Sequence, residues 1–218
     1  MTKGVVAGCG AALAGMIYVH VALPMQPLLS DYALLPGGML PVMLGMLALA
    51  GGCLSLAYGL TLREPNRSAA ARVLLMAAGG GLMLSAIFPT DPHSGADTLG
   101  GEIHRWAAAV FFTALPVAGW VLARGREAGA RWGSVRVLSG GAGLVLAAYL
   151  LAHPASFISG WIDGAAYYGL LERALVGVDL VLLVGMAIAT GATATARTAA
   201  PEPAEPDADE PSPLRLVA

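Results

Sequence analysis

Charged and aromatic residues are scarce in this chain. Asp, Glu, Lys and Arg make up 12% of its 218 residues and aromatic residues 6%, whereas 57% of the residues are hydrophobic. About a quarter of the residues in an average soluble domain are charged, so this composition excludes an ordinary water-soluble globular domain. The mean hydropathy of +0.71 is typical of an integral membrane protein.

Cysteines and metal-binding motifs are scarce as well. The two cysteines, Cys9 and Cys53, lie in apolar stretches, and two such thiols form no disulfide framework. The sequence contains no HExxH motif and no other tightly spaced pair of metal ligands. We therefore expect both cysteines to be small packing residues.

Six apolar stretches are long enough to cross a membrane. At a rise of about 1.5 Å per residue, stretches of about 17–25 residues span a hydrocarbon core of about 30 Å. The alternating pattern of barrel strands is missing, so the stretches predict helices, which satisfy their backbone hydrogen bonds internally. They cover residues 4–24, 38–61, 70–88, 103–123, 135–152 and 168–190. The predicted fold is all-α, a compact bundle of six transmembrane helices within residues 1–195.

The basic residues predict the orientation of this bundle. Because Lys and Arg in short loops stay in the cytoplasm, a six-helix threading places the N- and C-termini there. Ten of the twelve basic residues fall on that side: Lys3, Arg63, Arg67, Arg72, Arg124, Arg126, Arg131, Arg136, Arg197 and Arg215. We expect the other two, Arg105 and Arg173, to pair locally with Glu102 and Glu172.

The composition also bears on location and on the end of the chain. Many Gly residues and eleven Arg against one Lys indicate a GC-rich bacterial genome and hence a multi-pass protein of the plasma (inner) membrane. Residues 196–218 are rich in Pro and acids with little to bury, which predicts a disordered cytoplasmic tail.

Polar chemistry concentrates on the predicted extracytoplasmic side. The segment 88–106 reads FPTDPHSGADTLGGEIHRW between two apolar stretches, and the threading places all four histidines on this side. The residues that we expect to line a pocket there are Asp91, His93, His104, His153 and Glu172.

Two further polar residues lie within the predicted helices. Asp179 falls about 16 Å inside the last helix, near the bilayer centre. A charge there costs about 2.5–3.5 kcal/mol on insertion scales, so we expect Asp179 to face other helices and to find a partner. His20 lies four residues after Met16 in the first helix, so the two share a helix face.

Three interpretations of the 88–106 segment remain open. A metal site would use His104, His153 and Asp91 as ligands. A pocket for a lipid headgroup or small solute would use the same side chains as hydrogen-bond partners. In the third, the segment is only a turn, in which Pro89 and Pro92 end one helix, Asp91 forms an Asx-turn, and Thr98 with Glu102 caps the next helix.

Several short motifs resemble a known family. FPTDP is followed by Thr98-Leu99-Gly100-Gly101-Glu102-Ile103-His104, Asp31-Tyr32 follows the first helix, and YGLLER begins the last helix at residues 168–173. This pattern resembles the bacterial domain of unknown function 998 family of six-helix integral membrane proteins, over about residues 5–190. In the family Gly100 is usually a histidine and Glu172 is commonly Gln. The resemblance implies the fold and the membrane location but no activity.

The sequence favours a binding role over an enzyme. The leading hypothesis is a pocket for a lipid-like or small ligand, and the alternatives are a membrane-embedded metal-dependent hydrolase and a structural or assembly subunit. Membrane lipid is the expected partner, no nucleic-acid partner is expected, and no cofactor is identified. The Gly4-x-x-x-Gly8 motif leaves a homo-oligomer open.

Overall fold

The computed structural model describes residues 1–92, 97–126, 129–158 and 164–199, without the side chains of residues 153–158, 164–166 and 193–199. The helices are α1 (Thr2–Ala22), α2 (Met39–Arg63), α3 (Ala69–Ile87), α4 (Leu99–Ala123), α5 (Ala130–Ile158) and α6 (Gly164–Ala199), with a short 3₁₀ helix, η1 (Ser30–Leu34), between α1 and α2. The described residues contain no strands, and all six α-helices are long and apolar enough to span a membrane. The predicted all-α fold with six transmembrane helices is confirmed.

The helix ends differ from the prediction mainly in the second half of the chain. Helices α1 to α3 begin and end within two residues of the predicted ranges, whereas α4, α5 and α6 are longer. Helix α6 continues to Ala199, past the predicted domain end at residue 195. Hydropathy marks the part of a helix that suits the hydrocarbon core, but backbone hydrogen bonding continues a helix beyond that part.

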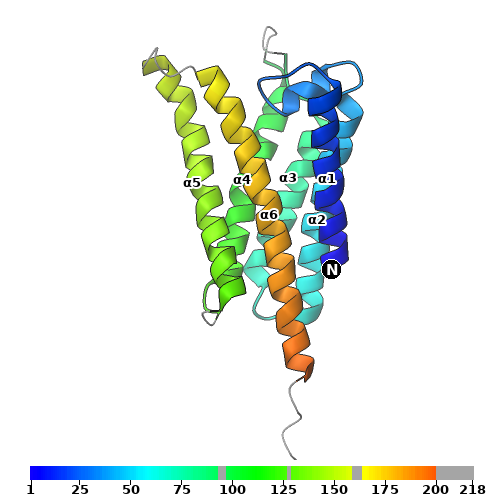
Figure 1. Cartoon of the computed structure of the whole chain (residues 1–218), viewed down its shortest axis with the longest axis vertical. Coiled ribbons are helices and arrows are strands. Elements are labelled where there is room, and N and C mark those ends of the chain that lie inside the picture. The colour runs from blue at the N-terminus through cyan, green and yellow to red at the C-terminus, as the bar shows by residue number, and fades with distance from the viewer. Residues whose placement is uncertain (93–96, 127–128, 159–163, 200–218) are drawn as a thin grey trace, which may run out of the picture.

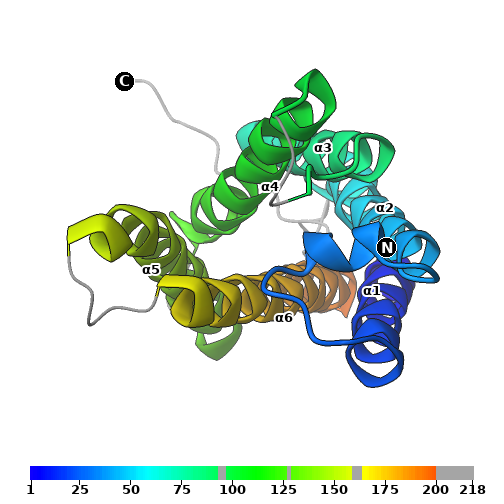
Figure 2. The same ribbon diagram turned by 90° about the horizontal axis from the view of Figure 1, so that it is seen from above.

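The six helices run side by side, and consecutive helices point in opposite directions (Figure 1). We call the end that carries η1 and the α3–α4 connection the η1 end, and the end that carries Met1 the N-terminal end. Seen from the η1 end, α6 lies between α5 and α1, and η1 lies across the middle of the bundle (Figure 2). Helix α6 contacts α1, α2, α4 and α5, so its side chains can reach most of the bundle.

Glycines bring neighbouring helices into close contact. A Cβ atom at Gly8 would lie 2.4 Å from the carbonyl oxygen of Ala48, and one at Gly81 would lie 2.5 Å from that of Ala107. Helix α1 therefore packs closely on α2, and α3 on α4, as small residues permit in lipid. Because Gly8 faces α2 of the same chain, it is not free to contact a second copy.

The basic connections meet at the N-terminal end. Arg126, after α4, donates two hydrogen bonds to the carboxylate of Glu64, at the end of α2, and its guanidinium lies 4.4 Å from the centre of the Trp132 ring. Arg67 donates to the carbonyl oxygen of Gly125. The α2–α3 and α4–α5 connections thus form one linked basic surface.

Candidate functional site

Arg173 on α6 holds the segment that joins α1 to α2. We call this segment, residues 23–38, the strap. The guanidinium donates from Nη1 to the carbonyl oxygen of Pro27 at 2.8 Å and from Nη2 to that of Gln26 at 2.7 Å. Its Nε donates to Nε2 of His20 at 2.9 Å. The strap is therefore bound directly to the η1 end of α6.

Two buried acids bind backbone amides of the strap. Glu172 accepts a hydrogen bond from the backbone N–H of Leu29 at 2.6 Å, and Asp31 accepts one from that of Leu28 at 3.0 Å. Glu172 is 8% exposed and Asp31 is 2% exposed. These bonds satisfy partly buried backbone N–H groups, so the acids fix the path of the strap over the bundle.

The predicted local pairing of the two outer arginines holds for one of them. Arg105 lies 2.6 Å from the carboxylate of Glu102. Within the described part of the chain, Arg173 and Glu172 form no ion pair. Consecutive residues on a helix project in different directions, and each of these two binds a different part of the strap.

His20 is a fixed part of this arrangement. Its Nδ1 lies 2.8 Å from the carbonyl oxygen of Met16, which can only accept, so Nδ1 carries the proton. Nε2 is then the acceptor for Arg173, which makes His20 a neutral imidazole. Its ring also packs against Tyr32, with the ring centres 5.0 Å apart. The intramembrane polar residue predicted on α1 thus links that helix to α6.

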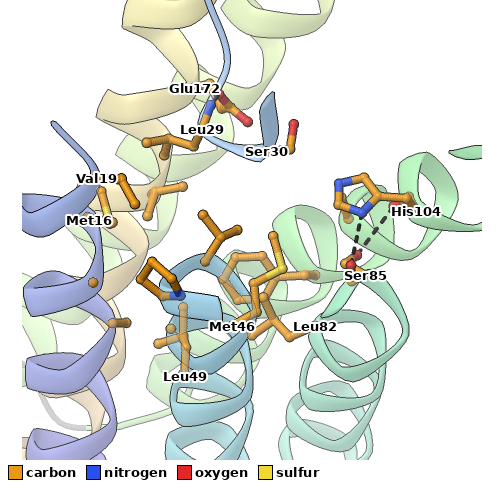
Figure 3. Close-up of a pocket in the computed structure, with 18 of the residues that line it drawn as sticks. Met16, Val19, Leu29, Ser30, Met46, Leu49, Leu82, Ser85, His104 and Glu172 are labelled. Atoms are coloured by element: carbon orange, nitrogen blue, oxygen red, sulfur yellow. Dashed lines mark hydrogen bonds between the residues drawn. The ribbon is translucent and has the colours of Figure 1, made fainter. Parts of the chain in front are cut away.

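A cavity of about 110 Å³ lies beneath the strap and η1 (Figure 3). It is bounded by α1, α2, α3, α4 and α6, and most of its wall is apolar. The polar residues at its wall are Ser30, Ser85, His104 and Glu172. Figure 3 shows Glu172 and Ser30 on the η1 side of the cavity, His104 at its edge, and Met46, Leu49 and Leu82 below. The side of the cavity next to η1, which we call its roof, is therefore polar. The opposite side, which we call its floor, is apolar.

His104 is buried, and it binds the end of α3. Its Nδ1 lies 3.0 Å from the carbonyl oxygen of Ser85 and 2.9 Å from that of Phe88. The carbonyl of Ser85 would ordinarily accept from residue 89, but Pro89 has no N–H. His104 supplies the missing donor. His104 and Glu172 border the same cavity.

Asp91 closes the α3–α4 connection. It accepts hydrogen bonds from the hydroxyl of Thr98 at 2.6 Å and from its backbone N–H at 3.0 Å. These bonds, and then the positive charge of Arg105, hold the pKa of Asp91 below its usual value. Thr98 in turn accepts from the backbone N–H of Gly101 at 3.1 Å, which confirms it as the N-cap. Asp91 thus binds Thr98, and the residues that line the cavity do not include it. The predicted Asx-turn would involve His93, which lies outside the described residues.

Asp179 is fully buried in α6. It lies in the middle of the span Tyr167–Ala192, with 0% of its surface exposed. Neither carboxylate oxygen has a hydrogen-bond partner among the described residues. The prediction that Asp179 faces other helices is confirmed, but the expected partner is not found in that part of the chain.

Two of the predicted site residues cannot be placed. His93 and the side chain of His153 lie outside the described residues. Among the side chains that are described, no group of three or more His, Cys, Asp and Glu is arranged to hold a metal ion. The metal site of His104, His153 and Asp91 therefore stays a prediction, as does the full pocket of five residues.

The sequence did not predict the contributions of Leu29, Ser30 and Ser85. Leu29 acts through its backbone N–H, for which a side-chain pattern gives no signal. Ser85 had a usable signal, because it lies four residues before Pro89 and its carbonyl must find another donor.

Comparison with known proteins supports the family resemblance. No curated protein and no solved structure matches the chain significantly. The family described as "Protein of unknown function (DUF998)" matches residues 6–189, a range that includes the strap, the cavity and Asp179. The chain therefore belongs to the DUF998 family.

Proposed function

We propose that this protein is a multi-pass protein of the bacterial plasma membrane that binds a small amphipathic molecule in the cavity beneath η1. The observation that carries the proposal is the cavity itself, whose otherwise apolar wall includes Glu172, His104, Ser30 and Ser85. Ligand sites are typically apolar hollows with a few convergent polar groups.

The basic residues support an orientation for this site. The arginines of the α2–α3 and α4–α5 connections gather at the N-terminal end, where Arg126 and Glu64 pair. Basic connections stay in the cytoplasm. In this proposal both termini are cytoplasmic and the cavity lies in the extracytoplasmic half of the bundle.

The polar groups favour a ligand that donates hydrogen bonds. Nδ1 of His104 donates to two carbonyl oxygens, which leaves Nε2 as the acceptor when the ring is neutral. Glu172 uses one carboxylate oxygen for Leu29 and has a second acceptor oxygen. A hydroxyl or ammonium group suits two acceptors, whereas a carboxylate would be repelled by Glu172.

The volume limits the apolar part of the ligand. An apolar cavity of about 150 Å³ binds benzene, and this cavity is smaller, at about 110 Å³. An apolar group of about four carbon atoms is therefore the expected occupant. A longer lipid chain would have to continue outside the cavity.

Saturation-transfer NMR on the purified full-length protein tests this proposal, with 1-butylamine, 1-butanol and butyrate as probes. We expect the amine and the alcohol to bind, and butyrate to give little signal. Ala108→Phe fills the cavity, because Ala108 lies at its wall, and should remove most of the signal. Ala109→Phe is the matched control, since Ala109 is exposed on the same helix. Equal signals from the wild type and Ala108→Phe would place the probes elsewhere and refute the proposal.

A further inference from the structure

Asp179 is a buried acid that the proposed ligand site does not use. Its carboxylate has neither solvent nor a hydrogen-bond partner among the described residues. A charge left in that position would have no compensation, whereas a protonated carboxylic acid is neutral. Asp179 is therefore more stable in this position as the protonated, neutral acid than as the charged carboxylate.

Among the described residues, no ion pair or hydrogen bond joins a basic side chain to Asp179. On α1 and α2 the titratable groups near Asp179 are Cys9, which contacts the carbonyl oxygen of Leu180, and Cys53, which interacts electrostatically with Asp179. Both thiols are buried. The sequence has no titratable residue between Arg105 and Arg124 on α4, or between Arg136 and Tyr149 on α5. On α6 the next acid is Glu172, seven residues nearer the η1 end.

The cavity approaches Asp179 from the η1 end. Glu172 and Val176 line the cavity, and Asp179 follows Val176 on the same face of α6. On α1 and α2 the deepest wall residues are Ala12 and Leu49, each within one turn of Cys9 or Cys53. Three residues of helix rise about 4.5 Å, so one layer of side chains separates the cavity floor from the carboxylate.

The path toward the N-terminal end is closed. Leu182, Leu183 and Met186 follow Asp179 on α6, and each has 0% of its surface exposed. Leu56 on α2 and Val5 on α1 are also fully buried. Several layers of apolar side chains therefore separate Asp179 from the basic end of the bundle.

From this geometry we propose that Asp179 is a proton-binding site at the centre of the membrane, and that it exchanges its proton with the η1 end through the cavity. Glu172 lies on the η1 side of the cavity (Figure 3) and can relay the proton, since its carboxylate accepts a proton and the resulting carboxylic acid donates it. Intramembrane acids form proton relays in pumps and transporters, and an acid that exchanges its proton with one side at a time suits such a role. The inference does not depend on the ligand proposed above.

Infrared spectroscopy of the full-length protein in lipid vesicles tests both parts. A protonated carboxylic acid has a carbonyl stretching band that a carboxylate lacks. We expect this band in the wild type at neutral pH and its loss in Asp179→Asn. Glu172→Gln should leave the Asp179 band in place, which separates the two acids. Absence of the band in the wild type, or a band of undiminished intensity in Asp179→Asn, would overturn the protonation of Asp179.

Exchange into D₂O tests the route. Val176→Phe should slow the isotope shift of the Asp179 band by roughly tenfold or more, because it fills the cavity floor. Val181→Phe is the control on the same helix, since Val181 is 56% exposed. Equal exchange rates in these two variants would overturn the route through the cavity.

Isotope labelling assigns the infrared band in the wild-type protein, so this assignment does not depend on the folding of Asp179→Asn. Labelling the aspartate carboxyl groups with ¹³C should shift the band in the wild-type protein, whereas a band from Glu172 would not move. Asp31 is the other deeply buried aspartate in the described residues, so the shifted band must survive in Asp31→Asn. Its loss in that variant would contradict the proposal.

Discussion

His104 and Ser85 are joined by two hydrogen bonds that tie α4 to the end of α3. Nδ1 of His104 donates to the carbonyl oxygen of Ser85 at 3.0 Å, and the hydroxyl of Ser85 donates to the carbonyl oxygen of His104 at 3.3 Å. The first bond replaces the one that Pro89 cannot make. The pair therefore fixes the polar edge of the cavity and the α3–α4 connection together.

Removing the imidazole should destabilise the bundle. His104→Ala leaves the carbonyl oxygens of Ser85 and Phe88 without a donor, which should lower the free energy of unfolding by about 1–3 kcal/mol. Unfolding in mixed micelles with increasing SDS measures this change. Trp106→Phe is the control, since Trp106 is 72% exposed and should have little effect. Equal stability of wild type and His104→Ala would contradict the role given to this histidine.

Adding a methyl group at Gly169 on α6 should displace the strap and destabilise the protein. A Cβ atom at Gly169 would lie 2.0 Å from the carbonyl oxygen of Pro27, so Gly169→Ala must displace the strap. We expect a loss of about 1–3 kcal/mol, as for other overpacked sites, and faster hydrogen exchange of residues 28–35. At Gly177 a Cβ atom would meet nothing within 4 Å. If Gly177→Ala were as damaging as Gly169→Ala, the contact with Pro27 would not be the cause.

The hydrogen bonds of Asp91 should contribute less as the solution becomes acidic. Because the folded protein holds the pKa of Asp91 below its usual value, the stabilisation is complete above the unfolded value of about 4. It is lost as the pH falls through the lower folded value. The difference in melting temperature between wild type and Asp91→Asn should therefore be largest at pH 5 and above, roughly, and should shrink toward about pH 3. A constant difference over this range would show that the charge of Asp91 does not matter.

Single cysteines should report the orientation. Asp97 lies before α4 at the η1 end and Asn66 lies between α2 and α3, and both are exposed. An impermeant thiol reagent added to intact cells should label Asp97→Cys and not Asn66→Cys. The wild-type protein, in which the thiols of Cys9 and Cys53 are buried, gives the background labelling. The reverse labelling would invert the proposed topology.

The sequence predicted the fold better than the site. Helix spans follow from the thickness of the hydrocarbon core, and α1 to α3 lie within two residues of their predicted ranges. Glu172 and His104 were both assigned to a pocket, and both border one cavity. The partners of Asp91 and His104 were not predicted, because they depend on side-chain direction and on the backbone groups left free at helix ends.

The two neighbouring contacts on α6 have a mechanical consequence. Glu172 holds Leu29 and Arg173 holds Pro27, and consecutive residues of a helix project about 100° apart around its axis. The strap is thus held at two different positions around the axis of α6. Rotation of α6 about its own axis in either direction must lengthen the contact with Leu29 or the contact with Pro27. The helix therefore cannot rotate without displacing the strap that covers the cavity.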